Sequence, residues 1–543
     1  MSYDNWIYKS RFPQDVVTEI LKNRNVENPD KFINPKYEDL VDPSVFKDID
    51  KALERIRSAV ASNEKIGIFM DYDADGVTGG AIMHKALSNV GAELEYYVPE
   101  RTEGYGLNEK AINEFAKKKV GLLITVDCGV KNHKEIAFAN GVGMDAIIVD
   151  HHQLDEALPE ALAIVHPKIV KRGIGLDLSG GGVAFMLSRA ILEDHGRAKW
   201  LIDLAAISSV ADVVPIVDDN RTIVKYGLIV LNKTKNIGLK ALYSVAGLNN
   251  KSIGVYDIGF VIAPRLNAAG RIAHPKDAFK LLISENTEEA KQLAEKLNHL
   301  NQIRQDKLAN AIKEAELEVL KSKQDTANAI VLLGQWDEGI IGLVASKICE
   351  KYNRPAIILT KVDGFLKGSA RSIKSINVTD LIGCAGEHLL SYGGHIQAAG
   401  LSLKADKYQT FIKIIKSEAK KFDKKLFVRN LQIDALLHAD QLNLKLAEQI
   451  EKLQPFGMGN PRPNFAIENV TVRDIKTIGK DSNHLKVTLC SADTANQCLM
   501  FDYINKSWFI EAGDKIDVVF SLSINEWNNR RNLDLIVEDV KKK

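Results

Sequence analysis

The stretch KIGIFMDYDADGVTGG, residues 65–80, joins an apolar run to three alternating aspartates. The apolar run is typical of a buried strand, and residues 77–89 have the pattern of a helix that follows it directly. Asp71, Asp73 and Asp75 therefore crowd together at the carboxyl end of a strand, where their charges repel one another unless cations lie among them. The stretch predicts a strand-to-helix crossover with a metal site at the end of the strand.

An EF-hand loop is one alternative for this motif, because it too begins with D-x-D-x-D-G. The twelfth position of such a loop needs a glutamate that binds calcium through both oxygens, and Ile82 stands there. A strand precedes the motif where an EF-hand has a helix, which argues against that reading as well. A solvated acidic turn with a helix cap is the second alternative for the motif taken alone.

Short apolar runs alternate with amphipathic segments after this motif, as in a parallel sheet with helical crossovers. We expect further strands at residues 94–98, 122–126, 146–149 and 162–165, and helices at residues 108–118 and 131–139. Beyond the glycine triplet at 180–182 the pattern turns helical to about residue 209, and a further α/β stretch is expected to about residue 283. The pattern as a whole predicts one large α/β domain.

Acidic residues directly follow two more of the expected strands. Asp127 directly follows one apolar run, and Asp150, His151 and His152 follow the next. Because the carboxyl ends of parallel strands lie at one edge of the sheet, we expect these side chains to converge with the first aspartates. A fourth candidate, Asp212, lies in the apolar run SSVADVVP, where a carboxylate needs a metal, a helix cap or an ion pair.

The rest of the chain predicts a long helix, a second α/β unit and a barrel. Residues 287–323 contain no proline or glycine and predict a helix of roughly 55 Å. Strands at 329–333 and 356–360 follow, with helices after Gly339 and near 379–390 and 406–420. Alternating apolar positions then predict a small β-barrel, and an OB fold is the commonest barrel attached to nucleic-acid enzymes.

Composition limits the classes of protein that this chain can belong to. Its 543 residues imply several domains, and 45% apolar with 26% charged residues is ordinary globular usage. A balance of 72 basic against 71 acidic residues means that any basic surface must be local. Five cysteines without a C-x-x-C pair argue against a zinc ribbon and favour a reducing compartment. Without a signal-peptide pattern or a long apolar run, we expect a cytoplasmic protein with no membrane anchor.

The order of the motifs D-x-D-x-D-G, D-C-G, D-H-H and the later aspartate resembles the DHH phosphoesterase superfamily. Four further runs narrow the resemblance to the RecJ family of single-strand-specific exonucleases, from about residue 60 onward. They are PRLNAAGR (264–271), GSARS (368–372), GGHIQAAG (393–400) and PFGMGNPRPNF (455–465). No catalytic position of the family's pattern is missing from this sequence.

This resemblance implies an α/β chain with a parallel-sheet DHH domain, a long linking helix, a smaller α/β DHHA1 domain and a C-terminal OB-fold barrel, with DNA passing between the first two domains. We place an N-terminal extension at 1–60, the DHH domain at 61–284, the linking helix at 285–325, the DHHA1 domain at 326–428 and the OB fold at 429–543. The family resemblance therefore predicts the same fold class as the pattern of strands and helices.

The resemblance also implies a centre of two divalent cations, Mn²⁺ or Mg²⁺. Its metal ligands match Asp73, Asp75, Asp127, His151 and Asp212, with Asp127 as the bridging carboxylate. Asp71 and His152 lie next to these ligands, and we assign them with Asp127 to catalysis. Two cations would activate a water for attack on phosphorus, so that no protein nucleophile is needed. His152 would hydrogen bond the phosphate or help the leaving group, or else only orient its neighbour.

Substrate contacts are expected from both α/β domains and from the barrel. The pair of glycines before His395 would let backbone N–H groups approach an anion at a helix start, and a tight turn is the alternative. The expected contacts are Arg101, Arg265, Asn267, Arg271, Ser369, Arg371, Gly394 and His395. Trp527, before the turn residues Asn528 and Asn529, would stack on bases, or else belong to the core.

The function implied by the family is 5′ to 3′ exonuclease activity on single-stranded DNA, releasing 5′-mononucleotides in recombination and repair. An oligoribonuclease or nucleotide phosphatase of the same superfamily is one alternative, although such enzymes are commonly shorter and lack the barrel. A non-catalytic scaffold that resembles RecJ is another, but such scaffolds have lost metal ligands. The resemblance also implies a single-strand-binding protein and a RecQ-type helicase as partners, and a monomer.

Overall fold

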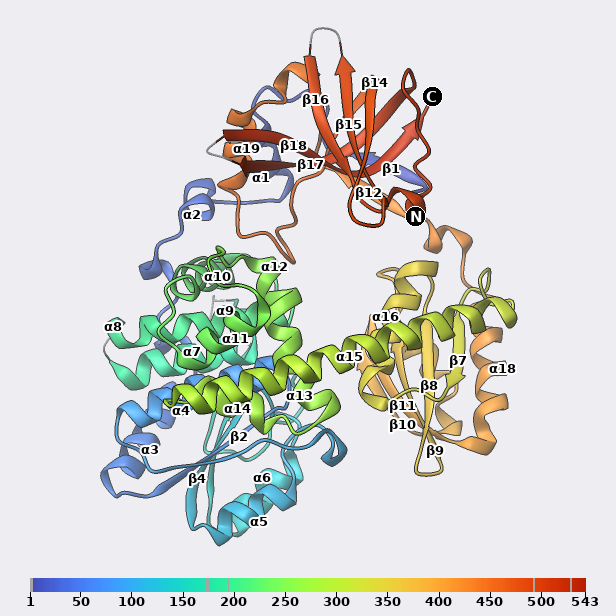
Figure 1. The fold of residues 1–543 in the computed structure, drawn as a ribbon. Coiled ribbons are helices and arrows are strands. Elements are labelled where there is room, and N and C mark those ends of the chain that lie inside the picture. Colours follow the sequence, from blue (N-terminus) through green and yellow to red (C-terminus); the bar gives the residue numbers. More distant parts are fainter. Residues whose placement is uncertain (1–2, 172–174, 194, 492–493, 528–529) are drawn as a thin grey trace. The chain divides into compact units, whose positions relative to one another are not determined.

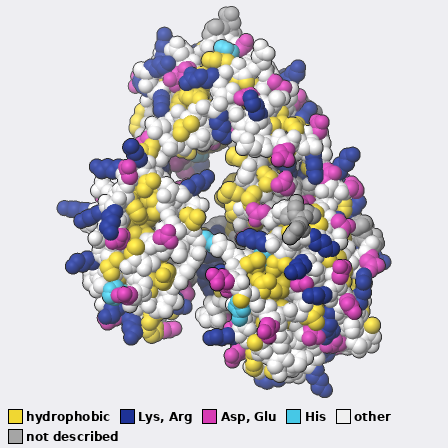
Figure 2. All heavy atoms as spheres, turned by 180° about the vertical axis from the view of Figure 1, so that it is seen from behind, with side chains coloured by type: hydrophobic (Ala, Val, Ile, Leu, Met, Phe, Trp, Pro, Cys, Tyr) yellow, Lys and Arg dark blue, Asp and Glu magenta, His cyan; other side chains and the backbone are white. Residues whose placement is uncertain are grey.

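The computed structural model describes residues 3–171, 175–193, 195–491, 494–527 and 530–543 (Figure 1). The chain forms two compact units, which we name by their main features. The parallel-sheet unit comprises Asp30–Arg304 and Gln454–Pro461, and the barrel unit comprises Met1–Pro29, Gln305–Leu453 and Arg462–Lys543. Lysine and arginine side chains are interspersed with aspartate and glutamate on the face shown in Figure 2.

A five-stranded parallel sheet in the order β3-β2-β4-β5-β6 forms the centre of the parallel-sheet unit. Its strands are β2 (Lys65–Met70), β3 (Leu94–Tyr97), β4 (Val120–Val126), β5 (Asp145–Val149) and β6 (Ala163–Val165). The predicted strands agree with these to within two residues at each end. The parallel sheet expected from the sequence is therefore confirmed.

Helices cover both faces of this sheet, which is why its central strands are apolar on both sides. On one face Ile68, Ile124 and Val149 pack against α3 (Ile49–Ala61), α4 (Ala74–Asn89), α7 (Gly180–Leu192) and α9 (Ile202–Ala211). On the other face Phe69, Leu123 and Ile148 pack against α5 (Glu109–Lys117) and α6 (His133–Gly141). Successive strand residues alternate between the two cores, as the pleat dictates.

The α/β stretch expected up to residue 283 is wrong, because the structure has only helices there among the described residues. They are α7, α8 (His195–Ala198), α9, α10 (Asp218–Leu231), α11 (Ile237–Ala246), α12 (Val255–Asp257), α13 (Ala263–Ile272) and α14 (Lys276–Ile283), with a π-helical turn at Ile258–Ile262. Short apolar runs in this region are the buried faces of helices, and periodicity cannot separate these from buried strands.

The predicted long helix is α15 (Thr287–Lys321), with 35 residues. Ala290, Ala294 and Leu297 near its start belong to the core of the parallel-sheet unit. Ala311 and Val319 near its end pack in the barrel unit against β7 (Ile330–Gly334) and α16 (Glu338–Tyr352). Each half of the helix therefore contributes to the core of a different unit.

The second sheet belongs to the barrel unit and has the order β10-β11-β9-β8-β7. Besides β7 it contains β8 (Ala356–Val362), β9 (Phe365–Arg371), β10 (Leu389–His395) and β11 (Ala398–Lys404), with helices α16, α17 (Val378–Gly383) and α18 (Tyr408–Ala419). The helix expected near 379–390 is only partly correct, because α17 ends at Gly383 and an edge strand follows. That strand carries glycines, which weaken any periodic signal in the sequence.

The C-terminal strands close into a barrel in the order β13-β14-β15-β16-β18-β17, with β17 pairing back to β14. They are β13 (Ala435–Leu436), β14 (Phe465–Ile478), β15 (His484–Ser491), β16 (Thr494–Met500), β17 (Lys515–Trp527) and β18 (Arg530–Lys542), with helices α19 (Leu444–Glu451) and α20 (Tyr503–Lys506). Leu485, Val487 and Leu489 are buried at alternating positions, as predicted. The predicted β-barrel is confirmed.

The first 60 residues, expected as one N-terminal extension, are divided between the two units. Strand β1 (Asn5–Tyr8) pairs in parallel with β12 (Asn430–Ile433), and α1 (Val16–Asn23) lies in the same unit. Beyond α2 (Pro29–Ile33), α3 packs in the core of the parallel-sheet unit. Of the helices in the described part of the chain, none has the length and apolar content that crossing a membrane requires.

Candidate metal centre

The first three aspartates form an elbow between β2 and α4. Asp71 follows the last residue of β2, and Asp73 caps α4 by accepting hydrogen bonds from the backbone N–H groups of Asp75 (2.8 Å) and Gly76 (3.1 Å). A Cβ atom on Gly76 would lie 2.4 Å from the carbonyl oxygen of Asp71, so the tight elbow requires glycine. The cap fixes one carboxylate at the helix N-terminus, where the helix dipole favours negative charge.

Asp75 points into the domain and is held by the start of α7. Its carboxylate accepts hydrogen bonds from the backbone N–H groups of Gly180 and Gly181, each at 2.8 Å, and from the hydroxyl of Ser208. A Cβ atom on Gly180 would lie 2.6 Å from Oδ1 of Asp127, which leaves no room for a side chain there. The glycine triplet therefore lets a helix N-terminus approach two of the carboxylates, a role that our sequence analysis missed.

Asp127 directly follows β4 and is buried with a left-handed backbone, at a φ of 61°. Such a conformation is uncommon outside glycine and is found at sites where the surroundings impose it. Within the described part of the chain, Oδ1 of Asp127 and Oδ1 of Asp71 are buried and have no hydrogen-bond partner. Two buried carboxylate oxygens without a partner are costly unless a cation compensates them.

Asp150 positions both histidines that follow β5. Its carboxylate accepts hydrogen bonds from the backbone N–H of Val130 (3.1 Å), from that of His151 (2.7 Å) and from the ring Nδ1 of His152 (2.8 Å). Burial opposes ionisation of Asp150, but the hydrogen bond and charge of His152 outweigh it and lower the pKa to about 2. Asp150 is thus ionised at neutral pH and orients the turn that carries both histidines.

The imidazole of His151 lies among three carboxylates. Its Nε2 is 3.2 Å from Oδ1 of Asp127, 3.6 Å from Oδ2 of Asp212 and 3.7 Å from Oδ2 of Asp75. Burial lowers the pKa of His151, although the charges of Asp75 and Asp150 oppose the shift. A neutral imidazole directed at several carboxylates has the protonation state that a metal ligand needs.

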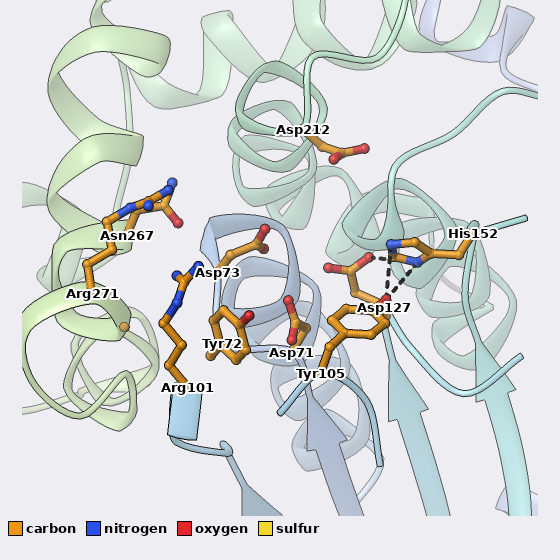
Figure 3. Close-up of a pocket in the computed structure, with 11 residues that line it drawn as sticks. Asp71, Tyr72, Asp73, Arg101, Tyr105, Asp127, His152, Asp212, Asn267 and Arg271 are labelled. Atoms are coloured by element: carbon orange, nitrogen blue, oxygen red, sulfur yellow. Dashed lines mark hydrogen bonds and ion pairs between the residues drawn. The ribbon is translucent and has the colours of Figure 1, made fainter. Parts of the chain in front are cut away.

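His152 and Tyr105 form a second layer beside this cluster. The hydroxyl of Tyr105 lies 3.0 Å from the ring nitrogens of His152 and donates a hydrogen bond to the carbonyl oxygen of Asp127 at 3.1 Å (Figure 3). Burial lowers the pKa of His152, but the hydrogen bond and charge of Asp150 outweigh it, so that the pKa is raised. Our sequence analysis missed Tyr105, which no spacing rule connects to the histidine pair.

The donor atoms form three overlapping groups, within each of which they lie no more than 4.8 Å apart. The groups are Asp127 with His151 and His152, Asp75 with His151 and Asp212, and Asp71 with Asp73 and Asp127. Asp212 reaches its group from the C-terminal end of α9. Because Asp127 and His151 each belong to two groups, the arrangement can hold more than one cation.

The electrostatics of the cluster agree with this geometry. Burial, followed by the charges of neighbouring aspartates, raises the pKa of Asp71 and Asp127 well above the usual range and also raises that of Asp73. The same causes raise the pKa of Asp212 to about 9. Ionisation of these carboxyl groups is unfavourable, and two of their oxygens lack a hydrogen-bond partner among the described residues. Both observations fit divalent cations that are bound through oxygen and imidazole ligands.

A pocket of about 230 Å³ opens over this cluster (Figure 3). It is lined by Asp71, Tyr72, Asp73, Arg101, Tyr105, Asp127, His152, Asp212, Asn267, Gly270 and Arg271. Arg101 and Arg271 face the aspartates from the opposite wall of the pocket, and Asn267 accepts a hydrogen bond from the backbone N–H of Ala74 at 2.8 Å. The pocket thus combines an acidic floor with cationic and amide groups on its wall.

Arg265, also expected to contact substrate, is not among the residues that line this pocket. Its guanidinium donates hydrogen bonds to Oδ1 of Asn298 (3.0 Å) and to the carbonyl oxygen of Val261 (2.8 Å). The contact with Asn298 ties α13 to α15 within the parallel-sheet unit. Its contact with substrate stays a prediction.

The structure brings Ser369, Arg371 and the Gly-Gly-His motif together on the second sheet. In the register Ala398 pairs with both Arg371 and His395, so these two side chains lie on the same face of the sheet, two strands apart. A guanidinium N–H of Arg371 donates to the hydroxyl of Ser369 at 3.3 Å. The sequence thus predicted the grouping of these residues, although not the secondary structure that creates it.

The helix start expected at the Gly-Gly-His motif is wrong, because the motif ends strand β10 and a hairpin leads into β11. Gly394 has a φ of 152°, and a Cβ atom on it would lie 2.3 Å from the carbonyl oxygen of Ala398. The glycine is therefore needed for close pairing of the two strands. The backbone N–H groups near this motif therefore belong to an edge strand and not to a helix start.

The expected stacking residue Trp527 ends β17, in the last pair of the register with Arg530 of β18. Its side chain, Asn528 and Asn529 lie outside the described residues. The antiparallel pairing of β17 and β18 agrees with the hairpin expected there. The stacking role of Trp527 stays a prediction.

Comparison with known proteins agrees with the geometry. Family models match at residues 65–209 (DHH family, N-terminal domain), 326–421 (DHHA1 domain) and 433–539 (RecJ OB domain). The single-stranded-DNA-specific exonuclease RecJ of Bacillus subtilis is 35% identical over 97% of this chain and 68% of its own length.

Solved structures of the same family lead to the same conclusion. The crystal structure of RecJ from Thermus thermophilus in complex with Mn²⁺ has a TM-score of 0.84 and 28% identity, covering 99% of this chain and 80% of that one. Its complex with Mg²⁺ has a TM-score of 0.79 and 26% identity, covering 99% and 78%. On this similarity over nearly its whole length, the chain belongs to the RecJ family.

Proposed function

We propose that this chain is a metal-dependent exonuclease that degrades single-stranded DNA from the 5′ end and releases 5′-mononucleotides, in recombination and repair. The observation that carries the proposal is the cluster of aspartates and imidazoles at three adjacent strand ends and at the end of α9, with two buried carboxylate oxygens that lack a hydrogen-bond partner among the described residues. Relatives named as single-stranded-DNA-specific exonucleases supply the substrate class.

Asp73, Asp75, Asp127, His151 and Asp212 would hold two divalent cations, Mn²⁺ or Mg²⁺, with Asp127 shared between them. Oxygen ligands with a single imidazole suit both ions. When bound, such a pair of cations supplies an activated water and neutralises charge on the departing oxygen. The chain's own contribution is to hold the carboxylates at fixed positions through the N-termini of α4 and α7.

The pocket wall would bind and orient the phosphodiester. Arg101 and Arg271 are directed into the pocket, where a guanidinium can pair with a phosphate through two hydrogen bonds. His152, whose Nδ1 is held by Asp150, would donate a hydrogen bond from Nε2 to a phosphate oxygen or to the leaving group, in place of its contact with Tyr105. Its raised pKa favours the protonated form that can donate.

Recognition of the 5′ end would fall to Ser369, Arg371, Gly394 and His395. A terminal phosphate monoester carries more charge than an internal phosphodiester, and an arginine beside backbone N–H groups distinguishes the two. The barrel, with Trp527, would hold more distant parts of the strand. A single-strand-binding protein, a RecQ-type helicase, a monomeric state and a cytoplasmic location stay predictions.

A time course with end-labelled substrates tests the proposal. The full chain with Mn²⁺ is expected to release labelled mononucleotide at once from a 5′-labelled strand and only late from a 3′-labelled one, and to be inactive in chelator. Matched RNA and duplex DNA should be degraded much more slowly. Preferred hydrolysis of RNA would favour an oligoribonuclease, and binding without hydrolysis in either metal would favour a non-catalytic scaffold.

A further inference from the structure

Two exposed aromatic side chains lie on the helix that leads into the metal pocket. Tyr256 and Phe260 are 69% and 68% exposed, and their rings are stacked with centroids 4.7 Å apart and an angle of 24° between the planes. The opposite side of the same helical run buries Ile258, Ile262 and Leu266 in the core. The core therefore does not need the two rings, and large exposed apolar groups of this kind mark binding surfaces.

The same helical run carries residues of the pocket wall. The π-helical turn Ile258–Ile262 joins α12 to α13, which contributes Asn267 and Arg271 to the pocket. Arg271 follows Phe260 by eleven residues, which is about three helical turns, so both lie on about the same side. Single π turns occur often at functional sites, because they shift the register of side chains along a helix.

Contacts with α9 place the helical turn that carries Phe260 beside the end of α9, from which Asp212 extends. A Cβ atom on Gly259 would lie 3.7 Å from Cγ1 of Val210, two residues before Asp212. Along the helix the seven residues from Phe260 to Asn267 span about 10 Å. That length matches about three nucleotides at the spacing of one strand of B-form DNA. A strand whose phosphodiester lies in the pocket can therefore reach the rings within a few nucleotides.

We propose that Tyr256 and Phe260 form a stacking platform for unpaired nucleobases a few nucleotides from the hydrolysed phosphodiester. The inference rests on the proposed function and names a determinant of its preference for single strands. Aromatic faces bind any base that is unstacked, whereas a duplex hides those faces in its own stack. The guanidinium of Arg265, which donates to the carbonyl oxygen of Val261 beside Phe260, adds positive charge for the strand backbone.

Truncation of the platform is the first test. In Tyr256→Ala, Phe260→Ala and the double variant, the KM for a 5′-phosphorylated oligothymidylate should rise about 5- to 100-fold while kcat stays within about twofold. Trp200→Ala is the matched control, because Trp200 is another exposed aromatic of the same unit, 48% exposed and outside the metal pocket. Phe260→Trp should retain most of the affinity, and circular dichroism must show that each variant is folded.

An abasic-site scan separates stacking from a general change in the protein. With one abasic nucleotide placed at successive positions from the 5′ end, the wild type should lose affinity at one or two adjacent positions. At those positions an abasic nucleotide should not lower the affinity of the double variant any further, because the base and the rings contribute to binding only as a pair. Equal additional losses in wild type and variant at every position would overturn the platform.

A small substrate keeps this test distinct from the test of the proposed function. Hydrolysis of thymidine 5′-(p-nitrophenyl phosphate), which has no further base, should be the same in wild type and platform variants. If the wild type hydrolyses no nucleic acid with Mn²⁺ or Mg²⁺, the proposed function is wrong. If the wild type degrades DNA and the variants match it on every substrate, the function stands and the platform is wrong.

Discussion

The metal pocket of the parallel-sheet unit and the Gly-Gly-His hairpin of the barrel unit are built in opposite ways. Asp71, Asp75 and Asp127 are buried at the ends of strands or within the first turn of a helix, and backbone N–H groups of α7 fix the position of Asp75. Residues 390–397 of the hairpin are exposed on an edge strand. Charges that must stay in place despite mutual repulsion need rigid burial, whereas groups that grip a polymer must be reachable from solvent.

This contrast predicts the largest effect for the carboxylate shared by two donor groups. Asp127→Ala should lower the rate of DNA hydrolysis on the order of 1,000-fold or more in Mn²⁺, because it removes a ligand from both groups. Binding of the strand should be largely retained, since the cationic groups lie elsewhere on the pocket wall. Single-turnover rates and fluorescence anisotropy measure the two quantities.

Asp155→Ala is the matched control, because Asp155 is an exposed aspartate shortly after the histidine pair. It should retain the wild-type rate. Substantial turnover of Asp127→Ala in Mn²⁺ would contradict the shared-ligand assignment.

A glycine variant tests whether the pocket is as rigid as its burial indicates. Gly180→Ala should lower the rate about 100-fold and weaken Mn²⁺ binding, because its Cβ atom would meet Asp127 at 2.6 Å and displace a ligand. Gly141→Ala is a clean comparison, since a Cβ atom there meets nothing within 4 Å. Mn²⁺ titrations followed by activity and by calorimetry would measure both effects, and a wild-type profile for Gly180→Ala would show that the pocket adapts.

The exposed hairpin should show a smaller effect that depends on the substrate end. Arg371→Ala should slow cleavage of a 5′-phosphorylated strand 10- to 100-fold, about 1.5 to 3 kcal/mol for one charge-assisted contact. The loss should shrink on a 5′-hydroxyl strand, where the extra charge is absent. Lys404→Ala, at the exposed end of β11, serves as the control in single-turnover assays. An equal loss on both substrates would mean that Arg371 contacts internal backbone.

The smallest expected effect is a dependence of thermal stability on metal and pH. A carboxyl group whose folded pKa exceeds its unfolded value binds more protons when folded, so stability without metal falls as pH rises between the two values. For Asp212 this window runs from 3.8 to about 9. Bound metal replaces those protons, and its stabilisation should therefore grow with pH.

Melting curves in chelator and in excess Mn²⁺ at pH 6 and pH 8.5 would check this expectation. Mn²⁺ should raise the first melting temperature by about 5 °C at pH 8.5 and by less at pH 6. Asp127→Ala should lose most of the increase. An increase that is equal at both pH values would indicate that the carboxylates of the pocket are not the binding site.

Motif positions relative to apolar runs were enough to predict the aspartates at the strand ends, whereas the assignment of Asp212, at the end of α9, needed the family resemblance. The aspartates after β2 and β4 and the histidine pair after β5 each come within a few residues of a strand, and parallel strands end at one edge. Contacts between residues far apart in the sequence could not be predicted in this way. Gly180 meets Asp75 across 105 residues, and Tyr105 meets His152 across 47, with no periodicity to connect them.

The sequence by itself determined the parallel sheet, the long helix, the barrel and the identity of the acidic cluster, because each depends on local hydrophobic periodicity or on residues adjacent to it. Only the tertiary structure decided that β1 joins β12 across more than 400 residues, that the Gly-Gly-His motif closes a hairpin, and that the described part of residues 180–283 contains helices and no strand. Those outcomes depend on which surfaces pack together, and the pairing of distant segments leaves no periodic signal in either segment.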